Sequence, residues 1–578
     1  MMKIAILGSG PSANYLLKSL IASEAPLEIV IYEARARFGY GQPYHPDLNS
    51  PTMLANIASL ELPPLTDSLE DWLKAQPDSA LRGLHVDRRD LHARAFLPRV
   101  ALGGYFAAQF EKTRAIGERR GHVIDFRPRH RCEDVICRSG VVDVLVRYPE
   151  GRLRTETFDH VVIATGHARP RARNDVPAVP VYPPPQIEPR SGFRIGILGS
   201  SLSGIDASLS MAMRLGAFEA TAEGLRFVPA PAAEGARLTL MSHSGLIPEA
   251  DFYCPLPAEP PEICTCEALL KLARQGPEGL LDRAFALFAQ ELEREDASYA
   301  RSIDLPTANA DDFAARYFGA RLRGDPFAGA RANLELARRN ARQRRVVAWR
   351  YAILRMHQAF EHLVRYFDVR DAQRFAAGLK RVFTDNYTAA PHASIERLLA
   401  LRDADTIEVR RVAPDYVVER CGERAALVVD RDWRASFDLL IDARGQPPLD
   451  AADLPFPTLR MQAMANAMFD LKTGRGRSEG ARSIEVGEDF RLAAGANAID
   501  RVFCIAVPFL LAKFPFSQGL TSAAEIGAVV ARSLISSARR GGTAPADAHA
   551  LHEATRLPSH VGMTVCGNGA VVYQPLAA

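Results

Sequence analysis

The sequence lacks an excess of charge of either sign. Its 578 residues carry 71 Lys and Arg against 68 Asp and Glu, which gives a formal net charge of +3. Nucleic-acid binding typically requires an excess of positive charge, which this balance does not provide. Long apolar runs are missing too: the longest, residues 502–512, contains Pro508 and is well short of the roughly 18 residues that span a membrane. We therefore expect neither a nucleic-acid partner nor a membrane partner.

Cysteine is scarce and scattered. The eight cysteines stand at positions 132, 137, 254, 264, 266, 421, 504 and 566, without the regular spacing of a disulfide framework, so we expect a reduced, cytoplasmic protein. The apolar N-terminal stretch is broken by Gly8, Gly10 and Pro11, where a signal peptide would continue. The chain also lacks C-x-x-C, H-E-x-x-H, G-x-S-x-G and P-loop motifs, so no metal site or covalent nucleophile is predicted.

What the sequence does contain is an α/β pattern. Apolar strand signals at residues 3–7, 27–32 and 159–164 alternate with a helix signal at 12–23. After a proline-rich passage at 170–189, read as a linker, a second series begins at residue 193 with a partner strand at 238–242. Residues 262–403 have helical periodicity, extended segments return at 406–442, and the chain closes with a strand at 501–507 and a helix at 517–535.

A first dinucleotide-binding fingerprint follows the first strand. Residues 8–13 fit G-x-G-x-x-G/A, and the residues that carry it are Gly8, Gly10, Pro11, Ser12 and Ala13. The first glycine permits the tight turn, the second lets a pyrophosphate approach, and the helix that follows offers unpaired N–H groups. Glu33 ends the second strand, where a carboxylate can accept hydrogen bonds from a ribose.

A second fingerprint follows the strand that begins at residue 193. Residues 199–204 read G-x-S-x-S-G, with Gly199, Ser201, Ser203 and Gly204 at the positions of the pattern. Serine replaces the middle glycine, which would hold a pyrophosphate slightly further from the backbone. Two such turns favour two nucleotides, one held tightly and one exchanged; the alternative is that the second turn is a relic of duplication.

Further motifs make the chain resemble a known family. They are the two fingerprints, Glu33, the ATGH turn at 164–167 with Thr165 and Gly166, and the segments at 54–59, 71–73, 96–99, 105–106, 244–248, 366–369 and 390–391. Over most of its length the sequence resembles the two-dinucleotide flavoproteins that include the N-hydroxylating and other class B flavin monooxygenases. It resembles most closely a bacterial FAD-NAD(P)-binding family.

The resemblance implies a fold and cofactors. It implies an α/β fold with two Rossmann-like lobes, FAD in the first and NADPH or NADH in the second, and an inserted helical region. Asn56 and Arg99 would lie near the flavin. The start of the last helix, with Gln518, Gly519, Leu520 and Thr521, would lie at the flavin ring, where its positive end stabilises the anionic reduced flavin. The alternative is an ordinary helix that Ser517 caps and that has no role at the flavin.

Two departures leave the second nucleotide open. Many NADPH-dependent relatives have an arginine after the partner strand, but here His243 stands in that position. The usual A-T-G near the last strand of the second lobe reads Ala443-Arg444-Gly445. A basic run between Arg338 and Arg350 is interpreted as a solvated face, the alternative being an anion or acidic-partner site.

The expected organisation has five segments. They are the FAD lobe (1–190 and 451–578), the NAD(P)H lobe (191–261 and 404–450) and a helical substrate or cap region (262–403). The expected activity is monooxygenation with O₂, in which a flavin C4a-hydroperoxide N-oxidises an amino acid or small amine. The alternatives are a reductase that passes electrons to a separate acceptor and a non-catalytic flavin-binding redox sensor. A homo-oligomer is possible.

Overall fold

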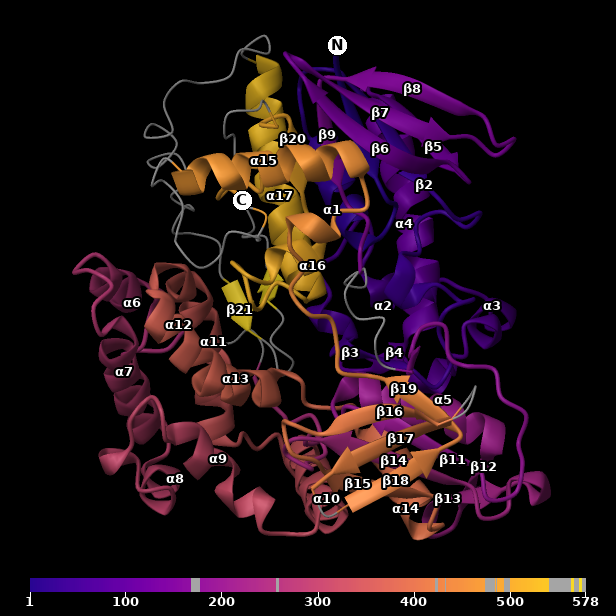
Figure 1. The fold of residues 1–578 in the computed structure, drawn as a ribbon, viewed down its shortest axis with the longest axis vertical. Coiled ribbons are helices and arrows are strands. Elements are labelled where there is room, and N and C mark those ends of the chain that lie inside the picture. The colour runs from indigo at the N-terminus through magenta and orange to yellow at the C-terminus, as the bar shows by residue number, and fades with distance from the viewer. Residues whose placement is uncertain are drawn as a thin grey trace.

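The computed structural model shows two sheet-containing lobes and a helical domain beside them (Figure 1). It describes residues 1–167, 177–255, 259–421, 425–431, 433–472, 484, 486–492, 499–539, 563–565 and 571–573. No helix within these residues is long and apolar enough to cross a membrane.

The first lobe is built on a five-stranded parallel sheet from both halves of the chain. In spatial order its strands are β20 (Val502–Cys504), β9 (His160–Ile163), β1 (Met2–Leu7), β2 (Leu27–Glu33) and β5 (Val123–Pro128). The central strands are almost wholly apolar and buried on both faces, as expected for a parallel sheet covered by helices. The C-terminal part of the chain therefore completes the sheet that the N-terminus begins.

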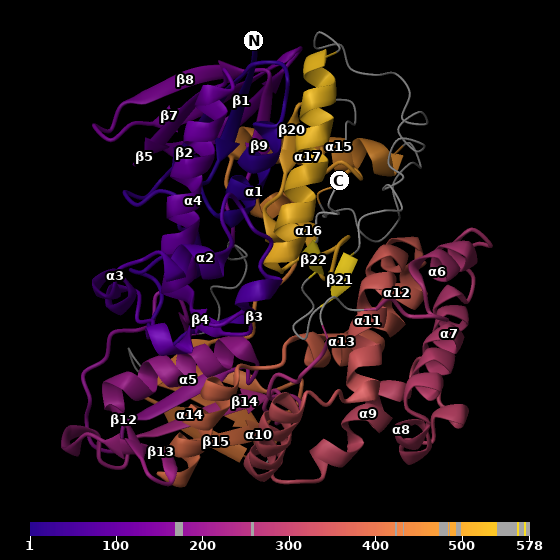
Figure 2. The ribbon, with the colours of Figure 1, turned by 180° about the vertical axis from the view of Figure 1, so that it is seen from behind.

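Helices α1 (Pro11–Leu20) and α17 (Leu520–Arg539) pack side by side against this sheet, as both views show (Figures 1 and 2). A side chain at Gly527 of α17 would place its Cβ 2.9 Å from the backbone nitrogen of Leu16, so a glycine is required for this close approach. The helix begins at Leu520, three residues after the expected start, and its first turn closes with the Ala523 N–H donating to the Gly519 carbonyl. The Ser517 hydroxyl donates to the Phe514 carbonyl instead of capping the helix.

Further elements complete the first lobe. The sequence pattern missed a three-stranded antiparallel sheet on it. Its strands are β6 (Arg131–Arg138), β7 (Val141–Arg147) and β8 (Leu153–Phe158). The Gln462 amide of α15 (Pro457–Lys472) pairs with the Cys137 backbone of β6. The other elements are α2 (Leu69–Lys74), α3 (Asp78–Gly83), α4 (Arg99–Arg119), α16 (Val507–Leu510), β3 (Leu54–Ala58) and β4 (Phe96–Pro98).

The second lobe has its own five-stranded parallel sheet. Its order is β10 (Val179–Pro180), β19 (Leu439–Asp442), β11 (Arg194–Leu198), β14 (Arg237–Ser242) and β15 (Ile407–Arg411). The proline-rich passage read as a linker thus contributes an edge strand, while residues 170–176 of it lie outside the described residues. Helices α5 (Leu202–Leu215), α10 (Pro326–Gln343) and α14 (His392–Asp403) share the core of this lobe.

Small antiparallel elements accompany the second sheet and the C-terminal part. They are the hairpin β12 (Gly216–Thr221) with β13 (Gly224–Pro229), the sheet of β16 (Val417–Cys421), β17 (Ala425–Asp430) and β18 (Trp433–Phe437), and the pair β21 (Met563–Val565) with β22 (Val571–Tyr573). Strands β14 and β15 are neighbours in the sheet but far apart in the chain. The helical domain is inserted between them.

The helical domain packs around a cluster of phenylalanines, with Phe288, Phe313, Phe360 and Phe383 fully buried at its centre. Its helices are α6 (Cys266–Ala273), α7 (Leu280–Glu295), α8 (Ala297–Ser302), α9 (Phe313–Leu322), α11 (Ala348–Leu363), α12 (Val369–Ala377) and α13 (Leu379–Tyr387).

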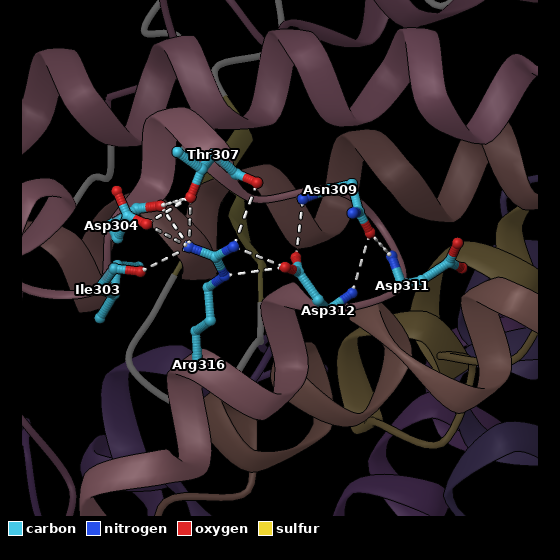
Figure 3. A network of polar contacts seen from close by, with 7 residues as sticks. All are labelled: Ile303, Asp304, Thr307, Asn309, Asp311, Asp312 and Arg316. Atoms are coloured by element: carbon cyan, nitrogen blue, oxygen red, sulfur yellow. Dashed lines mark hydrogen bonds and ion pairs between the residues drawn. The ribbon is translucent and has the colours of Figure 1, made fainter.

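One arginine fixes the loop between α8 and α9. The guanidinium of Arg316 donates to the Asp312 carboxylate (2.7 Å), the Asp304 carbonyl (2.5 Å) and the Thr307 hydroxyl (2.9 Å) (Figure 3). Asn309 continues the network, since its side-chain oxygen accepts from the backbone N–H groups of Asp311 and Asp312. A single side chain therefore ties this loop to α9.

Candidate functional site

The first fingerprint forms the turn between β1 and α1. Gly8 has φ +113°, and a Cβ there would lie 2.3 Å from the Ala164 carbonyl oxygen at the end of β9, so only glycine fits. Gly10 is the N-cap of α1 and Pro11 its first residue, which is the favoured place for proline. Ala13 is fully buried where the helix meets the sheet. The local structure is the strand–turn–helix that the pattern predicts.

Glu33 is held in place at the end of β2. Its carboxylate accepts from the Ser9 hydroxyl (2.8 Å) and from the backbone N–H of Arg35 (2.8 Å). The Ser9 hydroxyl in turn accepts from the backbone N–H of Gly39 (3.0 Å). A carboxylate has about four lone-pair sites, so Glu33 keeps acceptor capacity for a ribose.

Three glycines make close backbone contacts beside this turn. Gly10 and Gly41 approach closely: a Cβ on Gly10 would lie 3.3 Å from the Gly41 Cα, and a Cβ on Gly41 2.7 Å from the Pro11 Cδ. Gly39 packs in the same way on Ala107 of α4. Backbone without side chains at a helix N-terminus is the arrangement that lets a pyrophosphate such as that of FAD approach.

The second fingerprint has the same local geometry between β11 and α5. Gly199 has φ +112°, with its Cβ position 2.5 Å from the Ala443 carbonyl oxygen, and a Cβ on Gly204 would lie 2.4 Å from the Gly199 carbonyl oxygen. Ser201 takes the place of the middle glycine as the exposed N-cap of α5, and Ser203 is partly buried. The Ser200 hydroxyl points away from the turn, to the Leu246 carbonyl (2.6 Å).

A cleft of about 340 Å³ opens beside the second fingerprint. One wall belongs to the second lobe and the other to the helical domain. The lining residues are Ser200, Ser201, Ser244, Leu246, Ile247, Pro248, Phe318, Ala376, Lys380, Arg381, Thr384, Asp385 and Thr388. The segment at 244–248 therefore faces α13 across this cleft.

Arg99 links the two lobes. Its guanidinium pairs with Asp206 of α5 at 2.6 Å and donates to the Tyr182 hydroxyl (3.1 Å), which donates to Asp206 (2.7 Å). Burial raises the pKa of Asp206, and the charge of Arg99 opposes that shift. Thr165 and Gly166 follow β9, and Gly166 has φ +73°. The structure thus places Arg99 in an ion pair between the lobes, and its predicted flavin contact stays a prediction.

The predicted flavin-ring end lies where β3, α13 and the start of α17 meet. Asn56 of β3 donates to the Tyr387 carbonyl at the end of α13 (3.4 Å). At the start of α17, Gln518 and Gly519 are exposed, whereas Leu520 and Thr521 are buried. The structure therefore brings Asn56 and the helix start together through residues of the helical domain.

Sequence reasoning missed the helical-domain side of this site. The His357 ring lies 4.8 Å from the Phe516 ring and 5.0 Å from the Tyr387 ring, and burial lowers the pKa of His357 to about 4. Glu361 stands one turn further along α11, where burial and the charge of Glu525 on α17 raise its pKa to about 8. The i, i+4 spacing of His357 and Glu361 was the available signal, but it does not reveal what they face.

The buried cysteines and the basic run lie outside this site. Burial raises the pKa of Cys504 to about 12 and also raises that of Cys264, so these thiols are poor nucleophiles. Within the basic run, Arg338 pairs with Glu396 (2.8 Å), and the buried Arg350 lies 3.3 Å from Glu249. Residues 341–345 are exposed. The run is thus a mixture of solvated and internally paired arginines.

Comparison with known proteins identifies two of the regions. Residues 5–168 match the model of a family described as FAD-NAD(P)-binding, and residues 265–387 match a YdhS-like middle domain. The protein YdhS of Escherichia coli (strain K12) is 40% identical over 549 residues, which cover 93% of this chain and 98% of YdhS.

Solved structures of similar extent include two kinds of enzyme. The reduced form of ornithine hydroxylase from Pseudomonas aeruginosa is 13% identical and has a TM-score of 0.45, covering 93% of this chain and 99% of that chain. A bacillithiol disulfide reductase from Bacillus cereus is 11% identical and has a TM-score of 0.38 over the same shares. Neither similarity identifies a substrate.

The match of the N-terminal domain confirms the predicted cofactors, FAD with a nicotinamide dinucleotide, and with them the assignment to the flavin oxidoreductases. The identity with the Escherichia coli protein extends through both lobes and the helical domain. The chain therefore belongs to the family of YdhS, with an FAD-NAD(P)-binding domain at its N-terminus and a YdhS-like middle domain inserted in its second lobe.

Proposed function

We propose that this protein is an FAD-dependent monooxygenase that uses NADPH or NADH and transfers one oxygen atom of O₂ to the nitrogen of an amino acid or small amine. The observation that supports it most is the position of Glu361, beside a buried aromatic wall and close to the start of α17. A carboxylate there can hold the ammonium group of a substrate next to the site predicted for the flavin ring.

The wall keeps water away from this site. Tyr387 and His357 each pack edge to face on Phe516, and His357 is only 5% exposed. Because the pKa of His357 is lowered to about 4, its ring is neutral at physiological pH and adds no charge to the wall. FAD, when bound, supplies hydride acceptance and oxygen activation, and a dry pocket protects that chemistry from water.

Glu361 can also take up the substrate's proton. An amine needs a free lone pair to accept oxygen, but an aliphatic ammonium has a pKa of roughly 10, against about 4.3 for an ordinary glutamic acid. That difference makes the proton transfer uphill by roughly 8 kcal/mol. With the pKa of Glu361 at about 8 the gap falls to about 2 units, or roughly 3 kcal/mol. Without substrate this carboxyl is mostly protonated at pH 7, but an ammonium ion bound beside it favours the ionised form, which can then accept the ammonium proton and leave the amine unprotonated.

The test is oxygen transfer itself. FAD-loaded protein is reduced anaerobically with NADPH or NADH, mixed with ¹⁸O₂ and a panel of amino acids and amines, and followed by absorbance and mass spectrometry. We expect one substrate to gain a single ¹⁸O atom and to change the rate of flavin reoxidation. Glu361→Gln should lower the yield of this product and raise hydrogen peroxide. Glu293→Gln, on the exposed face of α7, is the matched control.

Reoxidation at one rate for every substrate, with no ¹⁸O product, would contradict the proposal. The electrons would then pass to a separate acceptor, as in the reductase alternative. Artificial acceptors such as quinones, tested on the same reduced protein, identify that outcome directly.

A further inference from the structure

The cleft beside the second fingerprint carries positive charge on its helical-domain wall. Lys380 and Arg381 occupy the first turn of α13 and line the cleft opposite Ser201 and Ser244. The two cations therefore face the serine-rich wall of the second lobe across this cleft, which has a volume of about 340 Å³.

These cations lack a carboxylate partner. Among the described residues, no acidic side chain lies within ion-pair distance of Lys380 or Arg381. The one carboxylate in the lining, Asp385, is already engaged by Arg321 (2.6 Å) and the Tyr317 hydroxyl (2.9 Å). Burial lowers the pKa of Lys380, which reflects the cost of holding an ammonium there without an anion.

The helix itself makes the arrangement less favourable. The N-terminal end of a helix is positive, so acidic residues favour the first turn and basic ones disfavour it. The first turn of α13 contains Lys380 and Arg381 and no acidic residue. Arg381 is positioned over the Phe318 ring, 5.5 Å from its centre, which keeps the guanidinium at the cleft. An anion in the cleft would compensate all three sources of positive potential.

We propose that Lys380 and Arg381 of the middle domain bind a phosphate group of the nicotinamide dinucleotide held at the second fingerprint. The inference rests on the proposed use of NADPH or NADH by this lobe. Lysine meets a phosphate as a point charge and arginine as a planar fork, and both suit a dianionic group. The phosphate is either part of the pyrophosphate or the 2′-phosphate of NADPH, which share this chemistry.

This role joins the two sites through one helix. The first turn of α13 faces the nucleotide cleft, and its last residue, Tyr387, belongs to the aromatic wall next to Phe516. A nucleotide that neutralises Lys380 and Arg381 therefore holds the helix that also shapes the substrate side. The middle domain would thus contribute to nucleotide binding as well as to the aromatic wall on the substrate side.

The experiment measures equilibrium binding, without turnover. NADP⁺ and NAD⁺ are titrated by calorimetry into FAD-loaded wild type, Lys380→Gln and Arg381→Gln, with flavin absorbance and circular dichroism as folding checks. Each substitution should weaken binding about tenfold, the loss of one charge-assisted contact at a partly exposed site. Lys380→Arg, which keeps the charge, should recover most of the affinity, and Lys271→Gln on the exposed face of α6 should change nothing.

The two nucleotides separate the two sources of phosphate. Equal weakening for NADP⁺ and NAD⁺ assigns the cations to the pyrophosphate, whereas weakening for NADP⁺ alone assigns them to the 2′-phosphate; both support the inference. Wild-type affinity in Lys380→Gln and Arg381→Gln would overturn it while leaving the proposed nucleotide site intact. If wild type binds neither nucleotide, the proposed function fails first, and the inference fails with it.

Discussion

The ion pair between Arg99 and Asp206 offers a sharp test of how the two lobes are joined. Both side chains are largely buried, at 16% and 7% exposure, and their N–O distance is 2.6 Å. Removing one member of such a pair leaves the other charge buried without compensation, which typically costs about 3–5 kcal/mol. Because Arg99 keeps some solvent contact, we expect about 3 kcal/mol for Arg99→Met.

A double-mutant cycle measures the coupling. Asp206→Asn keeps the shape of the side chain and an acceptor for the Tyr182 hydroxyl, but leaves Arg99 without its anion. We expect each single variant to be destabilised and the double variant to lose less than the sum, with a coupling of about 2 kcal/mol. Urea denaturation followed by circular dichroism gives the free energies, and flavin absorbance reports the first lobe separately.

Additive losses, within about 0.5 kcal/mol, would refute the reasoning. The flavin content adds a second reading. If Arg99 acts through Asp206, the FAD content of Asp206→Asn and Arg99→Met should change together. Loss of FAD only in Arg99→Met would instead support the flavin contact that the family resemblance implies for this residue.

Three further changes have defined outcomes. Gly8→Ala should lower the free energy of unfolding by about 3 kcal/mol or more, because its Cβ meets a backbone oxygen. Gly10→Ala should change the stability of the apoprotein by no more than about 1 kcal/mol but lower its FAD content, because the added Cβ crowds the Gly41 loop. Thermal unfolding measures the first effect and flavin absorbance the second. Glu361 keeps its proton in the folded state up to about pH 8 but loses it near its ordinary pKa when unfolded, so stability falls as pH rises through that window. Glu361→Gln should be the more stable protein at pH 9, by up to about 5 kcal/mol, and gain nothing at pH 4. Arg316→Ala should speed proteolytic cleavage between α8 and α9, and an unchanged cleavage rate would mean that the loop holds without this network.

Local pattern was enough to predict the two nucleotide turns. At Gly8 and Gly199 the backbone has nearly the same positive φ, and a Cβ at either position would lie at nearly the same short distance from a carbonyl oxygen at the end of a neighbouring strand, so both turns require glycine. The parallel strands next to the turns were predictable for the same reason, since their apolar runs are continuous. The antiparallel sheet of β6 to β8 was missed because its strands mix buried and exposed residues with many charges.

The substrate side could not be predicted in this way. His357, Tyr387 and Phe516 come from three separate segments, and no spacing rule connects them. Lys380 and Arg381 likewise looked like ordinary surface residues of an amphipathic helix until the fold placed them across from Ser201. Nonlocal packing decides these contacts, and helix periodicity says only which residues share a face.

The pairing of β20 with β9 bears on how the protein acquires its flavin during biosynthesis. About 340 residues separate these two strands, so a ribosome needs some tens of seconds to supply the second after the first. Through that interval the edge of β9 is an open template for other chains, and α1 lacks the helix that covers it. We therefore expect FAD capture to follow completion of the chain. Chains that terminate before α17 should appear as colourless, aggregation-prone material, and cofactor supplied after synthesis should serve as well as cofactor present throughout.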